Sequence, residues 1–286
     1  MRRTSALLSA GALATGALVT ATPASAHHSW ATHHWARTAD TFTVQLGDNV
    51  NATWDGYLTR TDADWSSAAQ PLTTTVVAGS TSGKRCQPTA GRVGVCNASY
   101  GKNGWLGLAQ IWLSGEHITQ GTAKVNDTYF AMDRYDNRGE RLHVLCQEVG
   151  HTFGLGHTSE DGTSQATCMD YSRSSDADVT TDLATVNPGS SVAPNAHDFE
   201  QLSSIYAHFD DTTTVGATSG SAARLQPSDD KASWGREVAH DAQGAWSVFV
   251  RRGDGEQRLV MHVTWADDER GKRVHEGHEH HDHSTH

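Results

Sequence analysis

Between Gln147 and His157 the chain carries side chains of the types that bind and use a metal ion. The segment reads QEVGHTFGLGH. Gln147 and His151 are one helical turn apart, so their side chains share a helix face and can converge on one ion. Glu148 lies beside the first of them, and Gly154 allows the sharp turn that brings His157 to the same ion. Three protein ligands would leave one coordination position open for chemistry.

The reaction that such a site supports is hydrolysis. A divalent ion lowers the pKa of its bound water, and Glu148 can take the released proton. The weak point is Gln147, because a neutral amide is a poorer zinc ligand than an imidazole. Three alternatives stay open: a working Gln/His/His site, a site that binds metal weakly or prefers another ion, and an inactive module that binds metal or protein.

The spacing of these residues resembles the metzincin signature H-E-x-x-H-x-x-G-x-x-H, with Gln147 in place of the first histidine. Downstream, Cys168-Met169-Asp170-Tyr171 is similar to the Met-turn of that family, a tight turn under the metal. Tyr171 stands two positions after Met169, where some metzincins carry a tyrosine near the zinc. The resemblance covers roughly residues 100–210.

The resemblance implies a secreted zinc-dependent endopeptidase with one catalytic zinc ion and a peptide or protein substrate. Gln147, His151 and His157 would be its metal ligands, and Glu148 its general base. Tyr171 would help the ion to stabilise the oxyanion. On this interpretation, Glu148→Gln abolishes peptidase activity and Gln147→His tightens zinc binding.

A helix must position the first of these residues. Asn137 and Glu140 have the spacing of a capping box at its start. The apolar positions that share its buried face are Leu142, Leu145 and Val149. Gly154 and Gly156 end the helix, since glycine tolerates the left-handed conformation needed there. His143 lies a full turn before Gln147, too far from the ion, and is expected to contact the sheet or a ligand.

The rest of the pattern predicts a metzincin-like α+β fold, a twisted mixed sheet with an active-site helix and a C-terminal helix. Alternating or apolar runs predict strands at 41–46, 76–77, 93–95, 105–113 and 118–125. The strand over 105–113 could pair with an extended peptide substrate. Residues 158–193 read as a long loop, and Asn195 begins a second helix that ends near His208.

The chain divides into segments of different composition. Arg2 and Arg3, an apolar run and Ala24-Ser25-Ala26 indicate a secretory signal peptide. Strand patterns near the C-terminus, joined by a Gly-Asp-Gly turn, predict a small β-hairpin appendage. The expected division is signal peptide 1–26, metallopeptidase domain 27–210, linker 211–230, small β appendage 231–267 and disordered histidine-rich tail 268–286.

The net charge of the chain and its expected export argue against some classes of partner. Without residues 1–26, 20 Lys and Arg stand against 33 Asp and Glu, a net charge of −13. An acidic chain is poorly suited to nucleic acid or an anionic membrane surface, so we expect a secreted, extracellular monomer. Histidines are dense over residues 275–286, which could bind additional metal weakly. A metal-sequestering role therefore stays as a further alternative.

The four cysteines favour disulfides. Their even number, together with an export signal, predicts two bonds, and the absence of any C-x-x-C pair argues against a cysteine metal site. Three connectivities are possible, of which local pairing, Cys86–Cys96 and Cys146–Cys168, is the simplest. The second bond would tie the metal-binding helix to the Met-turn.

Overall fold

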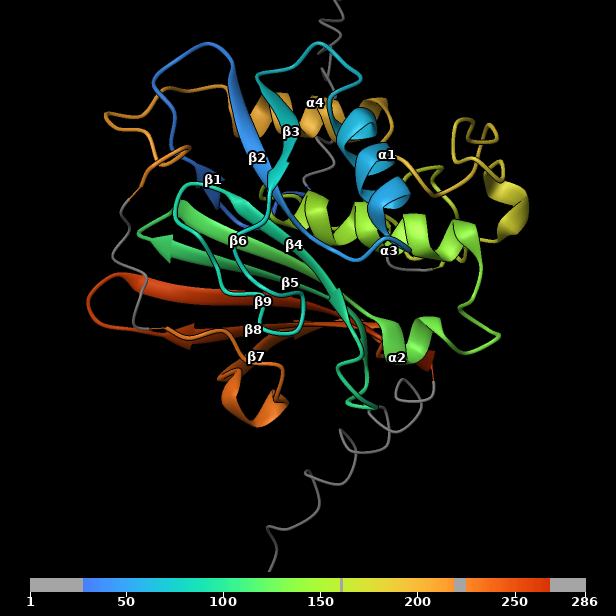
Figure 1. The fold of residues 1–286 in the computed structure, drawn as a ribbon. Helices are drawn as coiled ribbons and strands as arrows, with labels where there is room; N and C mark the ends of the chain where they lie inside the picture. Colours follow the sequence, from blue (N-terminus) through green and yellow to red (C-terminus); the bar gives the residue numbers. More distant parts are fainter. Residues whose placement is uncertain (1–27, 160–161, 219–224, 268–286) are drawn as a thin grey trace, which may run out of the picture.

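A nine-stranded mixed sheet organises the chain (Figure 1). The computed structural model describes residues 28–159, 162–218 and 225–267, so the expected signal peptide and histidine-rich tail lie outside it. The strands are β1 His34–Trp35, β2 Phe42–Asn49, β3 Leu72–Ala78, β4 Val93–Ala98, β5 Trp105–Ser114, β6 His117–Asn126, β7 Arg236–His240, β8 Trp246–Arg252 and β9 Gln257–Trp265. The α-helices are α1 Asp55–Trp65, α2 Asp127–Phe130, α3 Arg138–His151 and α4 Ala196–Ile205. The predicted α+β class is confirmed.

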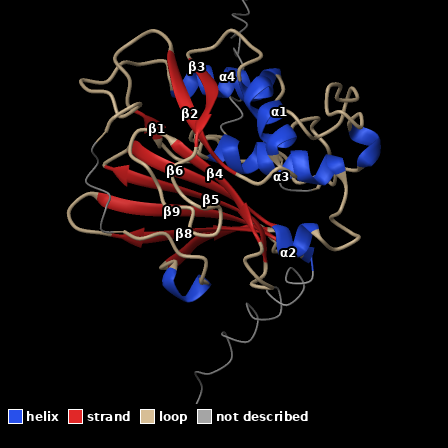
Figure 2. Cartoon of the chain, in the orientation of Figure 1, coloured by secondary structure: helices blue, strands red, loops and turns tan. Residues whose placement is uncertain are grey.

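The sheet runs in the order β3-β2-β4-β6-β5-β9-β8-β7, with β1 added beside β6. Pairs from β3 to β6 are parallel, whereas β5 is antiparallel to β6 and to β9. Figure 2 shows α1, α3 and α4 on one side of this sheet. The strands expected from the sequence are all present, with ends that differ by a few residues.

The sheet continues beyond strand β5 because this strand is buried on both of its faces. It has apolar side chains on both faces, since Leu106 and Ile111 join the core under the helices while Trp105 and Trp112 join a second core. A strand buried on both faces reads as a continuous apolar run and belongs inside a sheet rather than at its edge. Trp234 on the C-terminal segment closes the second core.

The C-terminal hairpin is therefore not an appendage. Strands β8 and β9 form the predicted hairpin, but β9 also pairs with β5 along its whole length, from Trp105 opposite Trp265 to Ser114 opposite Gln257. The expected boundary between 27–210 and 231–267 thus does not separate two cores. The expectation that β5 offers its edge to an extended substrate is wrong as well, because β9 occupies that edge.

The two helices expected from their caps are confirmed. Asn137 caps α3 by accepting the backbone N–H of Glu140, although the Glu140 carboxylate bonds to Arg173 rather than closing a capping box. Asn195 and Asp198 form a complete capping box at the start of α4. Helix α1 was not expected: its Asp- and Thr-rich sequence has a weak apolar stripe and no side-chain cap at Trp54.

An ion pair between a buried lysine and a partly exposed aspartate holds the segment before β7 to the sheet. Lys124 on β6 has a side chain only 1% exposed and pairs with Asp229, which is 33% exposed. We expect Asp229→Ala to lower the free energy of unfolding by about 2 kcal/mol, because it leaves the buried ammonium group of Lys124 without a counter-charge. The partial exposure of Asp229 to solvent limits the loss to this size. Urea denaturation would measure it. The exposed Asp211→Ala is the control, and equal losses in both variants would contradict this role.

Within the described residues, none of the helices is long and apolar enough to cross a membrane.

Candidate metal centre

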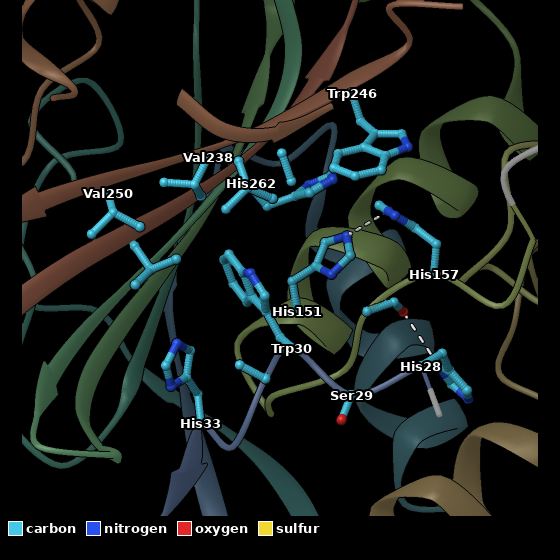
Figure 3. A pocket seen from close by; sticks show the side chains of 15 residues that line it. His28, Ser29, Trp30, His33, His151, His157, Val238, Trp246, Val250 and His262 are labelled. Atoms are coloured by element: carbon cyan, nitrogen blue, oxygen red, sulfur yellow. Dashed lines mark hydrogen bonds between the residues drawn. The ribbon is translucent and has the colours of Figure 1, made fainter. Parts of the chain in front are cut away.

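Three histidines from separate parts of the chain meet at the end of α3 (Figure 3). His151 is the last residue of α3, His157 follows the turn at Gly154, and His262 lies on β9. Each offers one ring nitrogen, and these atoms all lie within 4.8 Å of one another. The Nε2 atoms of His151 and His157 are 3.1 Å apart. The group could hold a metal ion.

Hydrogen bonding fixes which nitrogen of His151 is available. Its Nδ1 lies 2.8 Å from the carbonyl oxygen of Leu155, which can only accept, so Nδ1 carries the proton. The Nε2 lone pair therefore faces His157. A backbone carbonyl behind a histidine ring is the usual arrangement that orients a metal-binding imidazole.

Burial keeps these imidazoles in the neutral form that a metal requires. It lowers the pKa of His151 to about 3, where the nearby His262 also lowers it, and the pKa of His262 to about 3. The pKa of His157 is also lowered, first by burial and then by the other histidines. At neutral pH all three rings thus present lone pairs.

Gln147 is directed elsewhere. Its Nε2 donates to the carbonyl oxygens of Cys168 at 3.0 Å and Asp170 at 2.8 Å, and its Oε1 accepts from Thr264 Oγ1 at 3.1 Å. The amide therefore ties α3 to the predicted Met-turn and to β9. The role of Gln147 as a metal ligand stays a prediction, whereas His262 joins the two predicted histidines in the structure.

Glu148 lies beside the histidines, completely buried. Its Oε1 accepts from Thr264 Oγ1 at 2.6 Å, and its Oε2 lies 3.5 Å from Nδ1 of His262. Burial raises the pKa of Glu148 to about 7, although the proximity of His151 and the Thr264 hydrogen bond act to lower it. Oε2 and Nδ1 of His262 are buried polar atoms without a hydrogen-bond partner among the described residues.

Glycine at position 107 leaves room for that carboxylate. A Cβ there would lie 2.7 Å from Val144 Cγ1 and 2.9 Å from Glu148 Cδ. We expect Gly107→Ala to lower the free energy of unfolding by about 2 kcal/mol through overpacking. Gly56→Ala is the control, since its Cβ would meet only Leu183 at 3.4 Å and helix α1 tolerates alanine. Denaturant curves in which Gly56→Ala loses more free energy of unfolding than Gly107→Ala would contradict the close packing at position 107.

Aromatic rings enclose the centre. The ring of Tyr171 lies 4.3 Å from that of His157, and its hydroxyl is 3.2 Å from Nε2 of His262. Trp246 and Trp30 contact the histidine rings from two other sides. Tyr171 is thus near the site, as the sequence predicted, and its hydroxyl is a polar group of this aromatic wall close to His262.

The histidines face a cavity of about 330 Å³. His151, His157 and His262 line it together with Trp246 and apolar side chains of β7 and β8, among them Val238 and Val250, as Figure 3 shows. A volume of this size matches small-molecule sites, which are mostly apolar with a few polar groups that fix orientation. The arrangement gives a ligand access to the histidine cluster.

Both predicted disulfides are formed. Cys146–Cys168 joins α3 to the turn that precedes Met169, and Cys86–Cys96 closes a loop before β4. Met169 is buried beneath α3, where a side chain at Gly150 would collide with its sulfur.

Removing the disulfide at the centre should affect stability and metal binding together. We expect Cys146→Ser with Cys168→Ser to lower the free energy of unfolding by about 3 kcal/mol, from the greater freedom of the unfolded chain. The matched pair Cys86→Ser with Cys96→Ser should cost about as much, but only the first should weaken zinc binding. Denaturant curves and zinc titration would separate these effects. Equal zinc affinity in both double variants would contradict the link between this bond and the metal centre.

His262 is the site residue that sequence reasoning missed. The signal was present in β9, where His262 and Thr264 interrupt the apolar run from Leu259 to Trp265 and share one face. His143 does not join the cluster; it is buried and bonds to the Ser191 carbonyl, which belongs to neither the sheet nor the metal ligands.

Comparison with protein-family models and with curated proteins finds no match to this sequence. The functional argument therefore rests on the side chains that the fold brings together.

Proposed function

We propose that this chain is a secreted, metzincin-like zinc peptidase in which His151, His157 and His262 hold the ion. The observation that carries the proposal is their convergence beside a buried glutamate in the lining of a cavity. The donor set fits zinc, because three neutral imidazoles with one open position are a common catalytic arrangement for this ion. When bound, zinc would act as a Lewis acid and make a coordinated water acidic near neutral pH.

Glu148 is the general base in this proposal. Its Oε2 has no hydrogen-bond partner among the described residues, faces the histidine group and is free to receive a proton. Thr264 holds the other carboxylate oxygen and fixes the orientation of the side chain. The raised pKa of Glu148 suits proton transfer, since a base works best when its pKa lies near the working pH.

Tyr171 assists at the developing oxyanion. Its phenol lies beside His262 and His157, so its O–H can turn from the His262 ring toward a substrate carbonyl. A preoriented donor in a site shielded from water stabilises developing negative charge more than it would in solution. Tyr171→Phe therefore tests the oxyanion role while it keeps the ring beside His157, and zinc content measured alongside reports any effect of losing the hydroxyl near His262.

Substrate reaches the centre through the cavity rather than along β5. Because β9 covers the edge of β5, an extended peptide cannot add to the sheet there. The apolar walls that Val238, Val250 and Trp246 provide favour a short peptide or chain end with a hydrophobic side chain.

The second candidate is an inactive module that binds metal or protein. It is favoured by the same covered edge and by the hydrogen bond that occupies Oε1 of Glu148. The two candidates differ in one assay, hydrolysis of a quenched peptide library by the full chain.

Peptidase function predicts cleavage that a chelator stops and added zinc restores. Chelator-treated protein without zinc is the control. Absence of cleavage by protein that contains stoichiometric zinc would favour the inactive module.

Export is part of the proposal. The two disulfides indicate an oxidising environment. Together with the signal-like N-terminal sequence, they support an extracellular site of action.

A further inference from the structure

A second group of metal-ligating side chains lies apart from the central histidines. It consists of His34 on β1 and His208 and Asp210, which follow α4, and their ligand atoms all lie within 4.8 Å of one another. His117, at the start of β6, contacts the same carboxylate of Asp210. We propose that these four residues bind a second divalent cation, zinc by the chemistry of the ligands, in a structural site. This inference is independent of peptidase activity.

The three histidines converge on one oxygen of Asp210. Oδ1 of Asp210 lies 3.3 Å from Nε2 of His34, 3.1 Å from Nε2 of His117 and 3.6 Å from Nε2 of His208. The Nε2 atoms of His34 and His208 are themselves 3.2 Å apart. Ligands bound to one tetrahedral zinc at about 2.0–2.1 Å are separated by about 3.3 Å, so the spacings among His34, His208 and Asp210 match a shared ion. His117, beside Oδ1 of Asp210, is the proposed fourth ligand.

Hydrogen bonding argues that a cation belongs between them. Nδ1 of His34 lies 2.7 Å from the carbonyl oxygen of Thr32, which can only accept, so Nδ1 carries the proton. In the neutral ring, Nε2 then points a lone pair at the carboxylate of Asp210. Two acceptors facing each other are unfavourable unless a proton or a metal ion lies between them.

Strand pairing and a backbone hydrogen bond position three of these residues. His34 and His117 are directly opposite each other in the β1–β6 pair, which places their rings side by side. The other carboxylate oxygen of Asp210 accepts the backbone N–H of Arg37 at 2.9 Å, which leaves Oδ1 turned toward the histidines. A carboxylate held from behind in this way is typical of an oriented ligand.

Four protein ligands fill the tetrahedral shell of zinc and leave no position for a substrate, so the expected role is structural. The site would clamp the N-terminal strand and the β5–β6 turn to the segment after α4, three parts of the chain that are distant in sequence. Its histidines range from buried His34 to half-exposed His208, so the ion can enter from solvent.

Zinc content of the full-length chain tests the proposal. Each protein is loaded with zinc and freed of loosely held metal by gel filtration, and its metal content is measured by mass spectrometry. The variant His208→Ala with Asp210→Asn should hold one fewer tight zinc ion than the parent chain. His157→Ala should lose a different ion, and combining all three changes should remove both. Every protein has the same tail, so any zinc that the tail binds cancels in the comparison.

The matched control is His240→Ala, an exposed histidine beside Glu237, which should keep the parent zinc content. A folded His208→Ala, Asp210→Asn variant with the parent zinc content would overturn the proposal. If that variant does not fold, His117→Gln alone should weaken the binding of the second zinc ion. The rise in Tm that this ion gives when zinc is added should then be lost. An unchanged rise would overturn the proposal equally.

Discussion

Replacing His262 with alanine should lower the zinc affinity of the central site by more than about 100-fold, since even residues that only orient a ligand change affinity by about 10–100-fold. His262 lies on β9, in a position to complete the shell begun by His151 and His157. Competition with a chromophoric chelator would measure the affinity. The second zinc ion proposed above should be unaffected.

Gln147→Ala is the informative comparison. It removes hydrogen bonds to Cys168, Asp170 and Thr264 and should lower the free energy of unfolding by about 2–3 kcal/mol, because buried polar groups lose their partners. Its effect on zinc affinity should be smaller than that of His262→Ala. A larger loss of zinc affinity in Gln147→Ala than in His262→Ala would indicate that Gln147 is a metal ligand. With His262 in place, we no longer expect Gln147→His to tighten zinc binding.

Glu148→Gln should reduce peptide hydrolysis by about 10²–10⁴-fold, the usual contribution of a positioned acid or base. The substitution keeps the size of the side chain and the hydrogen bond from Thr264 but removes the proton acceptor. Zinc affinity should change little, because Glu148 is not among the proposed ligands. Initial rates with the quenched peptides, on variants of equal zinc content, would measure the loss.

Tyr171→Phe provides a graded control for that result. It removes one hydroxyl from the cavity wall and should lower the rate less than Glu148→Gln does. An unchanged rate in Glu148→Gln would remove the general base from the mechanism and leave the metal-binding module as the better account.

The sequence predicted the local features of the centre because their determinants are local. The Asn137 cap, the apolar face of α3 and the glycine turn before His157 all lie within one short segment. The Cys146–Cys168 pairing followed from the same proximity. Periodicity likewise located β5, β6 and the β8–β9 hairpin, whose residues alternate or run apolar.

What could not be predicted depends on pairing between distant strands. Nothing within residues 257–265 specifies that β9 lies beside β5. The sequence therefore could not predict that β9 covers the edge of β5 or that His262 lies beside His151 and His157. The helix pattern predicts Gln147 as a ligand because it places the amide on the same face as His151. The hydrogen bonds of that amide to Cys168, Asp170 and Thr264 are tertiary contacts, which a helical period does not encode.

The most direct test is a crystal structure of the zinc-loaded chain with anomalous diffraction measured on both sides of the zinc edge. The account predicts an ion about 2.0–2.1 Å from ring nitrogens of His151, His157 and His262, with the Gln147 amide still hydrogen-bonded to Cys168 and Asp170. An ion bound through the Gln147 oxygen, with His262 turned away, would contradict it.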